Sequence, residues 1–73
     1  MPKALKRRDV LRVLRTLGFK QVSQRGSHLK FKRTDPSGDV TAIVPNYSEI
    51  PAGTVASIAR QAKVTWAEFE ALL

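Results

Sequence analysis

The chain has 73 residues, no cysteine, 42% hydrophobic residues and a formal net charge of +7. This length predicts one domain, residues 1–73, and the lack of cysteine excludes disulfides and thiolate metal sites. No apolar run approaches the roughly 20 residues that a membrane-spanning helix needs, so we expect a soluble, cytoplasmic protein with no membrane association.

The basic residues are concentrated in the first half of the chain. Residues 1–33 hold eleven of the thirteen lysines and arginines and a single acid, Asp9. This distribution predicts a face that binds a polyanion, and the simpler alternative is a solvated basic surface.

Residues 1–5 are predicted to be a loosely held lead-in, and residues 6–17 an amphipathic helix. The helix has an apolar stripe at helical spacing, formed by Val10, Leu11, Val13, Leu14 and Leu17. Gly18 suits the left-handed position that ends a helix, and Phe19 can pack back on the last turn. Arginines lie off the stripe and are expected to add non-specific affinity for RNA: Arg7, Arg8, Arg12 and Arg15.

Three strands are predicted next. The first covers residues 20–25, with Val22 pointing inward, and the second covers residues 28–34. The turn at residues 35–38, Asp-Pro-Ser-Gly, joins the second strand to an antiparallel third strand at residues 39–44.

Residues 45–49 are predicted to form a loop, and Pro51 to begin a helix. Its apolar stripe would be Val55, Ile58, Ala59 and Ala62. Gly53 allows either close packing or the approach of an anion to the backbone, and we favour packing. Thr65 and Glu68 form a capping box that predicts a short helix at residues 66–72, with Trp66 and Phe69 as packing residues.

The predicted fold class is therefore α+β. We expect an α-β-β-β-α order, with a three-stranded antiparallel sheet, helices packed on one face and a short C-terminal helix. The double-stranded-RNA-binding domain has the same order of elements.

The second strand carries the candidate site. His28, Lys30 and Lys32 alternate with Leu29 and Phe31, so an extended strand would place the two sets on opposite faces. The apolar pair would enter the core, and the imidazole and the two ammonium groups would form one row in solvent. Such a base, in a positive field, is suited to attack on a phosphodiester.

Several fragments, in this order and at this spacing, resemble the HicA toxins, which are small mRNA interferases of toxin–antitoxin pairs. The fragments are Leu17-Gly18-Phe19, Arg25-Gly26-Ser27-His28, Val44-Pro45-Asn46, Ile50-Pro51-Ala52-Gly53-Thr54 and Ile58-Ala59-Arg60-Gln61-Ala62.

The resemblance implies a double-stranded-RNA-binding-like fold and metal-independent cleavage of mRNA with no cofactor. It implies that His28 is catalytic and that a HicB-like antitoxin covers it. The chain departs from the family at Tyr47, where many relatives carry a second histidine. We expect a monomer when the chain is free of its antitoxin.

His28 would act as the base on the 2′-hydroxyl, leaving a 2′,3′-cyclic phosphate. The predicted substrate-binding residues are Arg25, Gly26, Ser27, Lys30, Lys32 and Tyr47. Among these, Lys30 would either stabilise the pentavalent phosphate or be a solvated strand lysine, and Tyr47 would either stack on a base or cover the edge of the core. The proton donor is left open among Lys30, Tyr47 and water.

Two rivals to the endoribonuclease hypothesis stay open. One is a non-catalytic RNA- or DNA-binding module, which the charge and the order of elements also fit. The other is a small interaction protein whose basic face meets an acidic protein.

Overall fold

The computed structural model describes all 73 residues, and its elements have the predicted order with two short strands added. They are β1 (Leu5–Lys6), α1 (Arg7–Thr16), β2 (Lys20–Arg25), β3 (His28–Asp35), β4 (Gly38–Pro45), β5 (Glu49–Ile50), α2 (Ala52–Gln61) and α3 (Trp66–Ala71). The three long strands form one antiparallel sheet in the order β2-β3-β4, and β1 pairs with β5 separately. The α+β prediction is confirmed.

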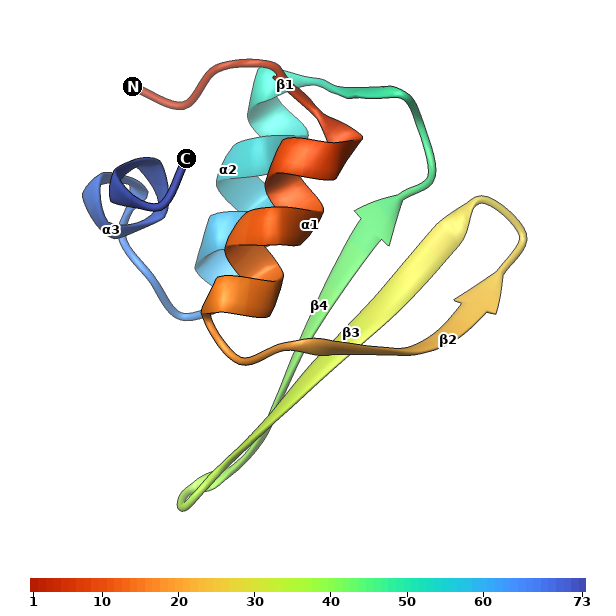
Figure 1. The fold of residues 1–73 in the computed structure, drawn as a ribbon, viewed down its shortest axis with the longest axis vertical. Helices are drawn as coiled ribbons and strands as arrows, with labels where there is room; N and C mark the ends of the chain where they lie inside the picture. The colour runs from red at the N-terminus through yellow and green to blue at the C-terminus, as the bar shows by residue number, and fades with distance from the viewer.

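The helices lie on one side of the three-stranded sheet (Figure 1). The strands contribute Leu29, Phe31, Ala42 and Val44 to the core, and all four are buried. The helices and the C-cap of α2 contribute Val10, Val13, Leu14, Val55, Ile58, Ala59, Ala62 and Phe69, and Phe19 and Ile50 complete the core. None of the three helices is long and apolar enough to cross a membrane.

Helix α1 ends as the sequence predicts. Gly18 has a φ of 93°, in the left-handed region. The N–H of Phe19 donates to the carbonyl of Leu14 at 2.9 Å, and the N–H of Gly18 donates to that of Arg15 at 3.0 Å. This pair of bonds is a Schellman motif, which turns the chain from α1 into the sheet.

Arg33 secures the same corner from β3. Its guanidinium carbon lies 4.7 Å from the ring centroid of Phe19, and its Nη1 donates to the carbonyl of Leu17 at 3.2 Å. Two further bonds join Arg33 to the carboxylate of Asp35, at 2.9 and 3.1 Å. One of the eleven basic residues of the first half therefore serves the fold.

The prediction for Val22 is wrong, because its side chain is 51% exposed. A regular ladder would place Val22 opposite Phe31. Instead, the register shifts between Gln21 and Ser23, and Gln21 pairs with Phe31 while Ser23 pairs with Lys30. Val22 is thus the extra residue of a β-bulge on an edge strand, and β2 runs out beyond the helices that would have covered it (Figure 1).

The predicted loose lead-in and the predicted loop at residues 45–49 are also partly wrong. Leu5 pairs with Ile50 and Lys6 with Glu49, which makes the small β1-β5 sheet. The N–H of Arg7, free at the start of α1, donates to the carbonyl of Ser48 at 3.1 Å. The segment after β4 is therefore tied to the beginning of α1.

Helix α2 buries the predicted apolar stripe, with Pro51 as its N-cap rather than its first residue. The packing interpretation of Gly53 is wrong, because a Cβ there would meet no atom within 4 Å. At the other end, the side-chain oxygen of Gln61 accepts a bond from the N–H of Ile43 at 2.9 Å. This bond ties the outer edge of β4 to α2.

Helix α3 begins at the predicted capping box. Glu68 N–H donates to Thr65 Oγ1 at 3.1 Å, and Thr65 N–H donates to Glu68 Oε1 at 2.8 Å. Trp66 stacks on Phe69 with ring centroids 5.6 Å apart. The two chain ends lie on the side of the domain where α3 sits, opposite the β2–β3 turn (Figure 1).

The capping box makes part of the stability depend on pH. Hydrogen bonds from Thr65 lower the pKa of Glu68 below its ordinary value of 4.5. The folded state therefore gains stability above pH 4.5 and loses it as the pH falls through the lowered pKa. We expect the melting temperature of the parent, relative to E68Q, to decrease between pH 6 and pH 3. E70Q, which removes an acid of the same helix whose side chain accepts no hydrogen bond, is the control. If the melting temperature of the parent relative to E70Q falls with pH as much as it does relative to E68Q, the assignment is contradicted.

Candidate nucleic-acid-binding and cleavage site

The predicted alternation of β3 is confirmed. Leu29 and Phe31 are buried under the helices, while His28 and Lys30 are exposed on the opposite, open face of the sheet. Pairing across the three strands extends this face into rows, because directly opposed residues share a face. The rows are Arg25–His28–Pro45, Ser23–Lys30–Ile43 and Lys20–Lys32–Thr41.

A pocket of about 450 Å³ lies over the first two rows. Its lining is Ser23, Gln24, Arg25, His28, Lys30 and Ile43. Arg25 and Lys30 thus flank the imidazole of His28, and no acid lines the pocket. Two cations and an imidazole in one solvent-open hollow favour an anionic ligand.

A two-residue turn places His28 at the beginning of β3. Arg25 pairs with His28, so the turn consists of Gly26 and Ser27. Gly26 has a φ of 58°, and a positive φ at the first position is what a type II′ hairpin turn requires. No atom lies within 4 Å of a Cβ built on Gly26, so the backbone conformation, rather than space, favours glycine here.

The other predicted binding residues lie outside the pocket. Lys32 is one row further along, and its Nζ forms an ion pair with Asp39 at 3.3 Å. Tyr47 is 52% exposed on the segment after β4, and Ser27 takes part in the hairpin turn without a side-chain hydrogen bond. The structure therefore brings Arg25, His28 and Lys30 together.

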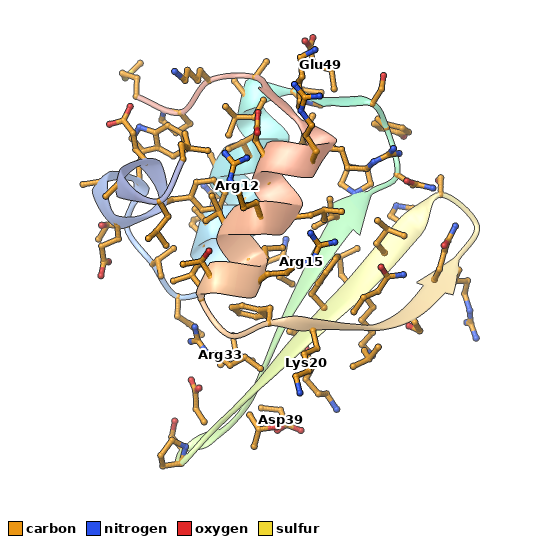
Figure 2. The ribbon with its side chains drawn as sticks, viewed as in Figure 1. Arg12, Arg15, Lys20, Arg33, Asp39 and Glu49 are labelled. Carbon is orange, nitrogen blue, oxygen red and sulfur yellow. The ribbon has the colours of Figure 1, made fainter.

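The arginines of α1 do not join the open face, because α1 packs on the other face of the sheet. Arg12 and Arg15 project from the helix (Figure 2), and Arg12 pairs with Asp9 at 3.2 Å. Arg7 differs from them: it is half-buried, and its Nη1 donates to Asn46 Oδ1. No group of three or more His, Asp or Glu side chains is placed to hold a metal ion.

Sequence reasoning missed several residues around the site. Ser23 could have been found by counting back from the two-residue turn, which sets it opposite Lys30. Ile43 required the register of the β3–β4 hairpin, which the turn at residues 35–38 determines. No local signal links Arg7 to Asn46, because 39 positions separate them.

These observations define a class: a small α+β domain whose open sheet face carries a histidine beside two cations. Comparison with known protein families shows that residues 7–64 match the sequence model of the family described as "HicA toxin of bacterial toxin-antitoxin". The chain belongs to the HicA toxin family, so it is the toxin of a toxin–antitoxin system and the family implies a HicB-like antitoxin as its partner. No curated protein matches the chain.

Proposed function

We propose that the protein is a metal-independent endoribonuclease that cleaves mRNA, with His28 as the catalytic base. The observation that carries the proposal is the pocket that His28 lines together with Arg25 and Lys30. RNA supplies its own nucleophile in the 2′-hydroxyl, so the site needs a base and positive charge next to the phosphate. Metal independence rests on the family resemblance.

In the proposed step, His28 takes the proton of the 2′-hydroxyl as the 2′-oxygen attacks the adjacent phosphorus. The bond from phosphorus to the 5′-oxygen breaks, and water, which reaches the open pocket, gives the leaving oxygen its proton. The products are a 2′,3′-cyclic phosphate and a 5′-hydroxyl. Lys30 and Arg25 stabilise the added negative charge of the pentavalent phosphate.

The rows of the sheet suggest the path of the RNA backbone. Successive rows are two residues apart along β3, or about 7 Å. With the scissile phosphate at His28 and Lys30, Lys20 and Lys32 of the next row would bind a neighbouring phosphate. The ion pair of Lys32 with Asp39 offsets part of the positive charge of this row. Tyr47, exposed beside the His28 end, is a stacking surface for a base.

The test uses purified protein and one RNA oligonucleotide in two versions. The first version is all-ribose, and the second has a single 2′-deoxyribose on the 5′ side of each mapped cleavage site. We expect cleavage of the first only, with 2′,3′-cyclic phosphate ends detected by mass spectrometry. Equal cleavage of both versions would contradict the mechanism, and salt-sensitive binding without cleavage would favour a non-catalytic RNA-binding module.

A further inference from the structure

The segment that follows β4 is held to two distant parts of the chain. The N–H of Asn46 donates to the carbonyl of Ser27 at 2.6 Å, and the carbonyl of Ser48 accepts the N–H of Arg7 at 3.1 Å. The side chain of Arg7 adds a third bond, from Nη1 to Asn46 Oδ1 at 2.5 Å. A continuous chain of hydrogen bonds therefore runs from the first residue of α1 to the turn that precedes His28.

The hydrogen bond between Asn46 and Ser27 lies directly before His28, the proposed catalytic residue. The carbonyl of Ser27 belongs to the peptide unit that joins it to His28, so fixing this carbonyl fixes the direction in which β3 begins. Hydrogen-bonded and non-hydrogen-bonded pairs alternate along an antiparallel ladder. Because Asn46 is hydrogen-bonded to Ser27, the adjacent pair His28–Pro45 is a non-hydrogen-bonded pair, in which opposed side chains lie closer together. Pro45, which has no N–H, fits that position on the edge strand.

The bond from Arg7 fixes Asn46 in turn. A guanidinium is planar, and its donors have fixed directions, so it constrains the amide that accepts from it. Both residues are half-buried, which limits the competition of water for this bond. Without Arg7, the side chain of Asn46 has no other hydrogen-bond partner in the protein, and only the backbone bond holds this residue to the turn.

We infer that Arg7 and Asn46 form a positioning pair that holds the β2–β3 turn, and with it His28, in the geometry needed for cleavage. This inference rests on the proposed function of His28. It distinguishes Arg7 from the exposed arginines of α1. Arg7 acts on the reaction through Asn46 and Ser27, and its effect should appear in turnover rather than in RNA binding.

Single and double substitutions test the pair by kinetics. We expect R7A and N46A each to lower kcat on the order of tenfold with KM changed less than twofold, and the double variant to be no slower than either single one. R7K, which keeps a donor, should recover part of the loss. R15A removes the same charge from an exposed position of the same helix and should leave kcat unchanged. Additive losses would show that Arg7 and Asn46 act independently, and a rise in KM alone would make Arg7 a phosphate contact. Either result would overturn the inference.

A second readout does not depend on cleavage. The chain has one histidine, so a single pair of ring C–H resonances in an NMR spectrum reports on His28. R7A and N46A should shift these resonances and speed hydrogen exchange at the Asn46 amide, whereas R15A should do neither. If all three variants have the parent spectrum and exchange rate, the positioning pair is refuted. If the wild-type protein cleaves no RNA, the proposed function fails, and the exchange data still decide whether the pair holds the turn.

Discussion

Replacing His28 with alanine is expected to lower the rate of RNA cleavage about a thousandfold, as loss of a general base does. The side chain is exposed and makes no hydrogen bond or ion pair within the protein, so its removal opens no cavity in the core. The melting temperature should therefore stay close to that of the parent. Expression of H28A should no longer arrest growth.

Thr34 offers a matched control for this variant. It is exposed on the same open face of β3 and lies outside the pocket. T34A should cleave RNA at the parent rate under the same conditions. If H28A also cleaves at the parent rate, or arrests growth equally, His28 is not the base and the mechanism proposed here is wrong.

Replacing Phe31 with alanine should have the largest effect on stability. Phe31 is 1% exposed, under the helices, and a buried phenylalanine reduced to alanine costs about 3–5 kcal/mol. A domain of this size has a free energy of unfolding on the order of 4–11 kcal/mol, so a large part of it would be lost. Because Phe31 lies between Lys30 and Lys32 in the strand, partial unfolding would also remove the open face.

Urea unfolding followed by circular dichroism measures this loss. V22A is the control, because Val22 is half-exposed on the bulge of β2, and its change should stay within about 0.5 kcal/mol. A loss of less than 1 kcal/mol for F31A would show that the sheet does not depend on this contact.

The parts of the fold that local chemistry determines were predictable. The stripe of α1, its end at Gly18 and the capping box at Thr65 each act over a few residues, and the structure has all three. The β1 and β5 strands were not predicted, because two residues are too few to show a period of two. The inward direction of Val22 was wrong because a bulge reverses the alternation without a sequence signal of its own.

The residues of the site likewise divide into those that local sequence predicts and those that only the tertiary structure reveals. The shared face of His28 and Lys30 follows from alternation within one strand, and the position of Arg25 opposite His28 follows from the two-residue turn. Arg7 and Asn46 required tertiary structure, because their contact depends on where the helix layer sits relative to the end of β4. The contact of Arg33 also required tertiary structure: alternation places Arg33 on the face of Leu29 and Phe31, but only the fold brings Phe19 beneath its guanidinium.

The position of the two chain ends matters for linking the toxin to its inhibitor in one polypeptide. The domain measures 31 × 30 × 17 Å, and both ends lie across its width from the β2–β3 turn (Figure 1). A flexible glycine–serine tether has a root-mean-square length of about 5–6 Å times the square root of its residue number, so it needs about 30 residues to reach that far. A dye or affinity handle at either end would, for the same reason, leave the pocket that His28 lines unobstructed.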